Sequence, residues 1–326
     1  MLKTYAQAIN DATRQIMTLD KSVVLMGQAV PGHAGVFGTT SGLVDLFGPD
    51  RVFDTPISEH GVTQMAAGMA QAGLRPIVVH QRVDFSLYAL DSIINWIAPW
   101  RFISGGNATM PLVIRMIVGK GWGQGPQHSK SLYSLFAHIP GLRVVTPGSP
   151  SDVKGLLISS VLSNDPVIFI EPRSLYSMTE EVPDEPYQIP LGPSVVRLQG
   201  GDVTLVTFSA MVPIALEAAR MAADSGVSVE VVDLRSISPL DLTGVINSVR
   251  KTARLVVCEA DWRDYGVAAE IVAGVSEALV MCPRPVRVTW PNSYVGASQA
   301  YEKAFYPTAE HLCQAVVGQY LGSVHA

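Results

Sequence analysis

Two separated stretches carry the side chains best suited to chemistry. In the first, Asp54-Thr55-Pro56-Ile57-Ser58-Glu59-His60-Gly61, a lone carboxylate stands where a short strand is expected to run into a nearly uncharged helix over residues 62–74. A carboxylate such as Glu59 at that junction either caps the helix or serves as a functional acid where water is scarce. Spacing alone favours the cap.

The second stretch is Gly119-Lys120-Gly121-Trp122-Gly123-Gln124-Gly125-Pro126, followed by Gln127-His128-Ser129. Its glycines match neither the dinucleotide-binding fingerprint nor a P-loop. They are typical of a rim where the backbone approaches a ligand closely, or of a plain connecting loop. We expect His128 at the start of a helix over residues 129–138, where it can bind a carboxylate or shuttle a proton. The alternative is an ordinary surface histidine.

The aromatic residues of a helix expected over residues 85–96 have two interpretations. Phe85, Tyr88 and Trp96 fit a core or an interface, which the residues alone favour, and Phe85 can also stack on a flat cofactor ring. No Ser-His-Asp order, paired carboxylates at fixed spacing or His/Cys metal cluster stands out in the sequence.

Strand and helix signals alternate through two blocks of the chain, and these elements must position the candidate side chains. In the first block, strands are expected at 22–26, 76–79, 112–118, 143–146 and 167–170, with helices at 5–19 and 151–162. In the second, strands are expected at 203–208, 228–233, 254–258 and 286–288, with helices at 213–223, 241–248 and 308–320. This alternation predicts an α/β fold with two open, mostly parallel sheets. A stretch rich in proline, glycine and acids separates the blocks, so we expect domains at 1–180 and 202–326 joined by a linker at 181–201.

Composition narrows the functional classes. The 326 residues are 48% hydrophobic and 16% charged with a net charge of -5, which gives no basic footprint for nucleic acid. The sequence has neither an apolar run of about 18 residues nor a signal-peptide core, so cytoplasm is the expected location and no membrane partner is expected. Three cysteines, Cys258, Cys282 and Cys313, lack metal-ligand spacing, and their odd number disfavours a disulfide framework. The apolar fraction fits either a large core or a surface for another subunit.

Several motifs together resemble the β subunit of the 2-oxo acid dehydrogenase E1 component, of the pyruvate and branched-chain type. They run in order from about residue 3 to residue 320. The motifs are Asp54-Thr55-Pro56-Ile57-Ser58-Glu59, Gly73-Leu74-Arg75-Pro76-Ile77, Gln127-His128-Ser129, His138-Ile139-Pro140-Gly141-Leu142, Val144-Val145-Thr146-Pro147, Asp165-Pro166-Val167-Ile168 and Gly266-Val267-Ala268-Ala269-Glu270-Ile271.

The resemblance implies a thiamine-diphosphate enzyme with a pyrimidine-binding domain and a transketolase C-terminal-type domain. In that family the residue matching Glu59 faces N1′ of the cofactor's aminopyrimidine, and the resulting hydrogen bond helps to remove the proton from thiazolium C2. Phe85 matches the aromatic residue that packs on the pyrimidine, and His128 matches the histidine that contacts substrate. Gln28 and Gln81 are expected to line the cofactor site beside Glu59.

One family motif is missing. The Gly-Asp-Gly segment followed by Asn, which holds diphosphate and Mg²⁺, has no counterpart, since Gly200-Gly201-Asp202 lies in the expected linker. The resemblance therefore implies an α-type subunit that carries this half of the site in an α2β2 assembly. It also implies a lipoyl E2 acceptor in the dehydrogenase case. A structural K⁺ near Leu112 and residues 160–165 is undecided, because Ser163 replaces a usual acid.

Other departures affect the pocket. Gln28-Ala29 stand where relatives usually carry Glu-Asp, and Gln81, Arg82, Trp122, Gln124 and Lys130 are also unusual. We hypothesise that Gln28, Arg82 and Gln124 fit an unusual donor or acceptor. The expected function is decarboxylation of a small 2-oxo acid and transfer of its acyl unit. The alternative is a split transketolase or carboligase subunit that uses an aldehyde or sugar acceptor.

Overall fold

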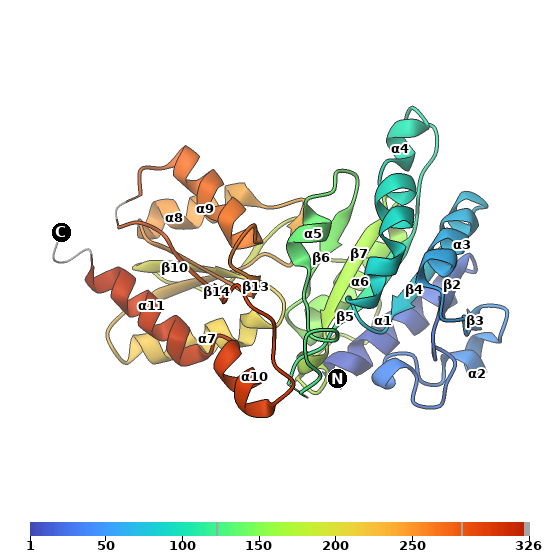
Figure 1. Cartoon of the computed structure of the whole chain (residues 1–326), viewed down its shortest axis with the longest axis horizontal. Helices are drawn as coiled ribbons and strands as arrows, with labels where there is room; N and C mark the ends of the chain where they lie inside the picture. Colours follow the sequence, from blue (N-terminus) through green and yellow to red (C-terminus); the bar gives the residue numbers. More distant parts are fainter. Residues whose placement is uncertain (122, 282, 323–326) are drawn as a thin grey trace. The chain divides into compact units, whose positions relative to one another are not determined.

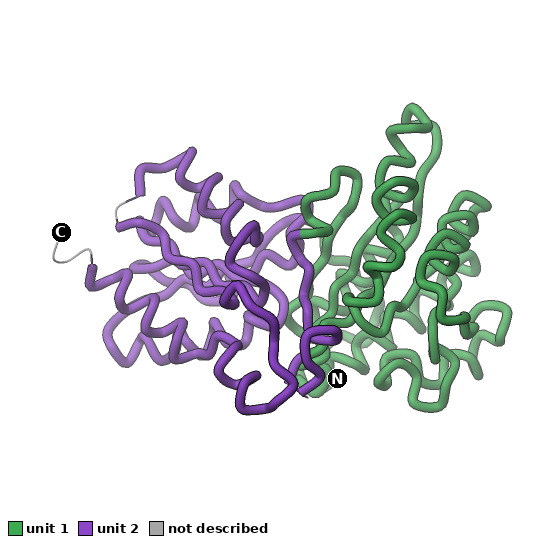
Figure 2. Tube along the Cα trace, viewed as in Figure 1, with its two compact units in different colours: residues 1–119, 135–191 green, residues 120–134, 192–326 purple. Residues whose placement is uncertain are grey.

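The computed structural model describes residues 1–121, 123–281 and 283–322. Two compact units make up the chain: unit 1 comprises residues 1–119 and 135–191, and unit 2 comprises residues 120–134 and 192–326 (Figure 2). Trp122 and Cys282, which were considered from the sequence, lie outside the described residues.

Unit 1 is built on a parallel sheet with the strand order β6-β7-β5-β4-β2-β3. The strands are β2 (Val23–Gly27), β3 (Val52–Phe53), β4 (Arg75–His80), β5 (Val113–Val118), β6 (Arg143–Val145) and β7 (Val167–Pro172). Their near-continuous runs of Val, Ile and Leu are buried, as expected for a parallel sheet covered on both faces. Two short strands, β1 (Leu2–Thr4) and β8 (Thr179–Glu181), form a separate antiparallel pair.

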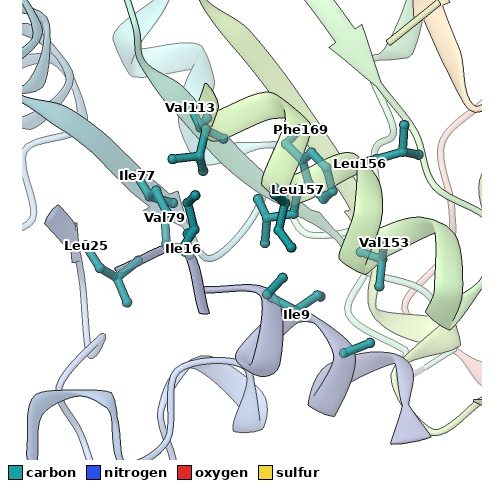
Figure 3. Packing of buried hydrophobic residues seen from close by; sticks show 14 of the residues in the cluster. Ile9, Ile16, Leu25, Ile77, Val79, Val113, Val153, Leu156, Leu157 and Phe169 are labelled. Atoms are coloured by element: carbon teal, nitrogen blue, oxygen red, sulfur yellow. The ribbon is translucent and has the colours of Figure 1, made fainter. Parts of the chain in front are cut away.

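Two long helices cover one part of this sheet. Helix α1 (Tyr5–Leu19) begins at a capping box of Thr4 and Gln7, and it packs against α6 (Pro150–Leu162). Ile9, Leu157 and Phe169 lie in the core between these helices and the strands (Figure 3). Burial of such side chains stabilises the fold by about 1.5–3 kcal/mol each.

The remaining helical segments of unit 1 are shorter, apart from the helix that begins at Glu59. Helix α3 (Glu59–Gln71) packs against β4 and against the segments η2 (Phe85–Ala89) and η3 (Ser92–Ile97). The others are η1 (Val36–Gly38), α2 (Leu43–Phe47), α4 (Trp100–Ile103) and η4 (Arg173–Leu175). The helix expected over residues 85–96 is thus a 3-10 segment followed by a π-helix.

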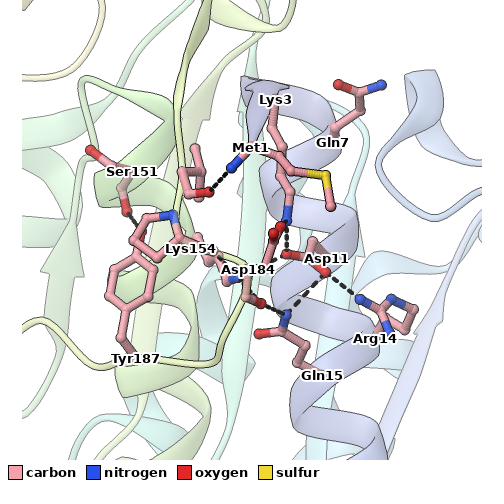
Figure 4. Close-up of polar contacts among 12 residues, drawn as sticks. Met1, Lys3, Gln7, Asp11, Arg14, Gln15, Ser151, Lys154, Asp184 and Tyr187 are labelled. Atoms are coloured by element: carbon pink, nitrogen blue, oxygen red, sulfur yellow. Dashed lines mark hydrogen bonds and ion pairs between the residues drawn. The ribbon is translucent and has the colours of Figure 1, made fainter.

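A polar cluster holds the first helix of unit 1 to the segment beyond β8 (Figure 4). The buried Lys154 ammonium lies 2.8 Å from an Asp11 oxygen and donates to the carbonyls of Pro183 and Asp184. Lys3 also donates to Asp11, at 2.6 Å. The stretch expected to be linker is therefore fixed to unit 1 through residue 184.

Unit 2 contains a second sheet, in the order β14-β13-β10-β11-β9. Strands β10 (Val203–Thr207), β11 (Val229–Asp233), β13 (Leu255–Trp262) and β14 (Val286–Trp290) are parallel, and β9 (Val195–Leu198) joins them antiparallel from within the stretch expected to be linker. Strand β12 spans Ser236–Ser238. The mostly parallel α/β fold class expected from the sequence is confirmed.

Helices cover both faces of the unit 2 sheet (Figure 1). Helix α7 (Met211–Ala223) packs with α11 (Ala309–Leu321) on one face, and α8 (Leu242–Thr252) packs with α9 (Val267–Ala278) on the other. The short helix α10 (Gln299–Phe305) precedes α11. Among all the residues described, no helix combines the length and apolar character needed to cross a bilayer.

The helix expected over residues 129–138 is much shorter, since α5 spans only Tyr133–Ala137. Leu132 adopts a left-handed backbone conformation with φ 54°, which a continuous α-helix cannot contain. Asp261 accepts the Tyr133 amide at 3.0 Å and so provides the start of α5 with a partner from β13. His128 therefore lies in a loop five residues before the helix, and the expectation that it stands at the helix N-terminus is wrong.

Candidate active site

The site residues of unit 1 follow three neighbouring parallel strands. Gln28 comes directly after β2, Asp54 after β3 and Gln81 after β4. The carboxyl ends of parallel strands share one edge of the sheet, which is the edge where open α/β sheets bind ligands. Asp54 ties this edge together, because one of its oxygens accepts the amides of Ala29 and Thr55, each at 2.9 Å.

Glu59 is the first residue of α3 and is half-buried. The N-cap position belongs to Ser58, whose side chain makes no capping hydrogen bond. Gln28 Nε2 lies 3.4 Å from Glu59 Oε1, and Gln81 Nε2 donates to the Gln28 carbonyl at 3.0 Å. In the part of the chain that is described, no donor binds Glu59 Oε2, so this oxygen is available for a ligand nitrogen.

Close packing of β2 on β4 sets the distance between Gln28 and Gln81. Gly27 adopts φ 149°, and a Cβ at that position would lie only 2.6 Å from the Val79 carbonyl oxygen. Glycine is therefore required here, because any larger residue would separate the two strands. The register pairs Gly27 with Val79, which brings the residues that follow the two strands side by side.

A buried histidine holds α3 to the sheet. His80, the last residue of β4, lies 3.1 Å from Thr63 Oγ1 of α3. Burial lowers the pKa of His80 to about 4, so its imidazole is neutral at pH 7. The sequence offered no reason to prefer this histidine over the others, since its burial depends on the packing of α3.

Phe85 begins η2 and is half-buried, which leaves part of its ring accessible. The nearby Arg82 is buried, and its guanidinium carbon lies 5.2 Å from the centre of the Phe37 ring. The guanidinium carbon of Arg173 lies 3.9 Å from the same centre. Arg82 is therefore part of a cation–π cluster with the loop after β2.

His128 belongs to unit 2, together with the glycine-rich segment. Its amide bonds the Gly125 carbonyl at 3.4 Å. Glu302 of α10 accepts the amides of Gly121 at 3.1 Å and Gly123 at 2.8 Å, so one buried carboxylate fixes the segment from far along the chain. Gly123 has φ 64°, and a Cβ there would lie 2.8 Å from the Ala297 carbonyl oxygen. No local sequence pattern points to Glu302.

Two buried acids on β13 position α5 and α9. Glu259 accepts the amides of Val267 and Ala268 at the start of α9, and Asp261 accepts that of Tyr133. Burial, reinforced by the charge of Asp261, raises the pKa of Glu259 to about 8. Burial also raises the pKa of Asp261 to about 6. The Gly-Val-Ala motif beginning at Gly266 is thus a helix start that binds a carboxylate.

Gln28, Gln81 and Glu59 are brought together in unit 1, with Phe85 four residues beyond Gln81. His128 and Gln124 are held in unit 2. The unit 1 set fits the aminopyrimidine half of thiamine diphosphate: a carboxyl group with one accessible oxygen, two amides and a half-buried aromatic ring. Within the described ranges, no group of three or more His, Cys, Asp and Glu is placed to hold a metal ion.

Comparisons with known proteins relate both units of the chain to transketolase-type domains. The family "Transketolase, pyrimidine binding domain" matches residues 2–179, and "Transketolase, C-terminal domain" matches residues 192–312. The chain is 43% identical to "Pyruvate dehydrogenase E1 component subunit beta" of Staphylococcus aureus over 279 residues, which cover 85% of this chain and 86% of the relative. The protein of the same name from Staphylococcus epidermidis is 42% identical, with the same coverage.

A solved structure described as "Split gene transketolase, inactive beta4 tetramer" superposes with a TM-score of 0.80. The match covers 98% of this chain and 99% of that chain at 21% identity, which shows a shared fold. The similarity to the pyruvate dehydrogenase subunits is twofold higher in identity and also extends through both units. The chain belongs to the family of E1 component β subunits, which combine the transketolase pyrimidine-binding and C-terminal domains.

Proposed function

We propose that this chain is the β subunit of a two-component thiamine-diphosphate enzyme that decarboxylates a small 2-oxo acid and transfers the acyl unit. The placement of Glu59 carries the proposal: its half-buried carboxylate stands at the start of α3 beside Gln28, at the ligand-binding edge of the sheet. The name of the relatives supports pyruvate as the first substrate to assay.

Thiamine diphosphate, when bound, supplies the carbanion-stabilising chemistry by which a 2-oxo acid loses carbon dioxide. Glu59 Oε2 would hold the proton shared with N1′ of the pyrimidine, and Gln28 would orient the carboxyl group through Oε1. Phe85 would pack on the pyrimidine ring. His128 would contact the substrate. The hydrogen bond from Gln81 to the Gln28 carbonyl supports this arrangement because it fixes the backbone that carries Gln28.

The experiment that tests the proposal is Glu59→Gln, assayed with the α-type subunit, thiamine diphosphate and pyruvate. Loss of the carboxyl group is expected to lower kcat by at least about 10²-fold, the typical contribution of a positioned acid–base group. Asp50→Asn, which removes an exposed carboxylate in the same unit, is the control and should leave turnover unchanged. Undiminished turnover in Glu59→Gln would exclude Glu59 from the mechanism.

An α-type partner completes the proposal, because the sequence lacks the Gly-Asp-Gly and Asn set for diphosphate and Mg²⁺. The relatives' designation as a β subunit supports a partner, and so do the exposed apolar side chains of residues 88–103. Tyr88 is 78% exposed, Phe102 90% and Ile103 62%, which is unusual for side chains of this size. An α2β2 assembly is the expected form, and cytoplasm the expected location.

The metal ions stay predictions. Mg²⁺ is expected mainly on the partner subunit. Near the segment considered for K⁺, the Asp165 carboxylate is bound by Arg101 and Arg143, while Ser163 donates to the Asp165 carbonyl. Metal analysis of the purified assembly measures both ions directly.

The acceptor distinguishes the dehydrogenase from a split transketolase or carboligase. The identity to the E1 β subunits favours a lipoyl group on an E2 protein, whereas the split transketolase shares the fold alone. Single-turnover assays with lipoyl domain and with glycolaldehyde should show acyl transfer to the lipoyl domain. Transfer to the aldehyde alone would favour the carboligase.

The positions at which the chain differs from the usual family residues carry a separate prediction. Gln28 contacts Glu59, and Arg82 packs on Phe37, so replacing them alters the site edge. Exchanging Gln28, Arg82 and Gln124 for the usual family residues should change the relative kcat/KM values for pyruvate and branched 2-oxo acids. An unchanged profile would show that these residues do not select the donor.

A further inference from the structure

A cavity of about 630 Å³ in unit 2 is lined by residues other than Glu59, Gln28, Gln81, Phe85 and His128. Its wall comes from the start of α7, from α10 and from the turn into α11, three elements on the same side of the unit 2 sheet (Figure 1). Pro213, Ile214, Tyr306 and Pro307 make much of the lining apolar. This volume falls within the ~300–1,000 Å³ range typical of small-molecule sites.

The ring of Tyr306 gives the cavity a rigid floor. Tyr306 is buried and packs edge-on against Trp290 and Phe305, with ring centres 5.4 and 5.5 Å apart. Interlocked aromatic rings of this kind hold their positions without a ligand. The cavity is therefore a built feature of the unit 2 core.

Four charged side chains line the cavity, and its two acids are already engaged. Glu302 accepts the amides of Gly121 and Gly123 through its two oxygens. Glu217 accepts both Nε and Nη2 of Arg220. Neither carboxylate therefore needs a further cation.

The two lysines are differently placed. Across residues 1–121, 123–281 and 283–322, Lys120 and Lys303 form no ion pair with an acid. The Lys120 ammonium lies 4.5 Å from the centre of the Tyr306 ring. Burial lowers the pKa of Lys120, because partial removal from water disfavours its charged form. An anion against this ammonium would offset that cost, and the exposed Lys303 adds a second positive charge at the rim.

We propose that this cavity binds a small organic monoanion: a carboxylate that lies against Lys120, attached to an aromatic or branched apolar body that packs on Tyr306, Ile214 and Pro213. The chemistry follows from the lining, since a rigid apolar wall recognises the body and the lysines recognise the charge. The site is additional to the proposed catalytic function and does not depend on it.

The position of Lys120 couples this site to the glycine-rich segment. Lys120 directly precedes Gly121, whose amide is held by Glu302 from the same cavity wall. A ligand that draws the Lys120 side chain toward its carboxylate acts on the backbone that leads to Gln124 and His128. Occupancy of the cavity therefore changes the environment of the Gly121 and Gly123 amides.

The test titrates the full chain with 3-phenylpropanoate by calorimetry, with the neutral 3-phenylpropanamide as the matched ligand control. Lys120→Met should weaken 3-phenylpropanoate binding by at least about tenfold, the effect of losing one charge-assisted hydrogen bond. Ile214→Trp should block binding by filling the cavity. Lys21→Met, which removes an exposed lysine of unit 1, should bind as the wild type does. The Gly121 and Gly123 amide resonances should shift on binding in the wild type and in Lys21→Met, but not in Lys120→Met or Ile214→Trp.

Three results would overturn the proposal. They are no binding at ~10 mM ligand, equal binding of the neutral amide, and binding unchanged by both Lys120→Met and Ile214→Trp. The last result would place the ligand elsewhere, including at the site near Glu59. Circular dichroism and thermal unfolding of each variant establish that it is folded. The two variants test the site independently, because Lys120→Met removes a charge and Ile214→Trp adds apolar volume.

Discussion

At the scale of single residues, Arg115 of β5 and Glu171 of β7 form an ion pair in the interior of unit 1. Both side chains are fully buried, with Arg115 Nη2 2.8 Å from Glu171 Oε1 and 3.1 Å from Thr39 Oγ1. Tyr176 also donates to Glu171, at 2.8 Å. The pair thus joins two central strands to the loop that follows Gln28.

Removing one member of this pair should leave an uncompensated buried charge. Glu171→Ala is expected to lower the free energy of unfolding by about 3–5 kcal/mol, measured by urea denaturation. The double variant Arg115→Met with Glu171→Leu should recover most of the loss, because apolar residues of similar volume need no partner. Equal stability of the single and double variants would show that the unpaired charge of Arg115 is not the cause of the loss.

The sequence indicates the residue types of the candidate site but not their contacts. Glu59, Phe85 and His128 could be singled out from local pattern and family resemblance. The bond between Gln28 and Glu59 could not, because it depends on the register of β2 against β4. Glu302 was missed for a similar reason: its two partners lie 181 and 179 residues earlier in the chain.

At the scale of elements, α3 is fixed to β4 by the contact between Thr63 and His80. Because the pKa of His80 falls from 6.5 to about 4 on folding, the unfolded chain binds this proton more tightly. The stabilising contribution is present above pH 6.5 and is lost as the pH falls toward 4. The contact with Thr63 itself persists in the folded chain until the pH approaches 4, where His80 gains its proton.

His80→Asn tests this, because asparagine can bond Thr63 but does not titrate. The free energy of unfolding of the wild type, minus that of the variant, should fall as the pH drops from about 6.5 to 4. The difference between wild type and variant is used because Glu259 and Asp261 are present in both proteins. Their raised pKa values make the free energy of unfolding increase as the pH falls, which is opposite to the effect of His80. Parallel curves would show that the pKa of His80 is the same in the folded and the unfolded chain.

Most elements could be predicted from hydrophobic runs and turn residues. Helix α1 occupies residues 5–19 as expected, and the buried strands lie within one or a few residues of their predicted bounds. The wrong predictions concern elements whose bounds depend on residues far away in the sequence. Asp261 starts α5 from 128 residues away, and β9 forms within a proline-rich stretch because β11 offers it an open edge. Such long-range effects leave no local sequence signal.

At the scale of the whole molecule, the exposed apolar side chains of residues 88–103 matter for assembly. If they are covered by the partner, then replacing Phe102 and Ile103 together with Gln should weaken association with the α-type subunit, measured by analytical ultracentrifugation. The isolated chain should keep its melting temperature, because both side chains are exposed. Val280→Gln, at a fully exposed position in unit 2, is the control. Unaltered assembly in the double variant would place the interface elsewhere.

The grouping of residues 120–134 with unit 2 has a consequence during synthesis. This segment leaves the ribosome before unit 1 is complete, yet its partner Glu302 follows Gly123 by 179 residues. At about 5–20 residues per second, the nascent segment waits roughly 10–35 s for that carboxylate. Strands β6 and β7 emerge meanwhile and can complete the first sheet. The alternating glycines disfavour both helix and strand, so the waiting segment is a poor partner for those strand edges.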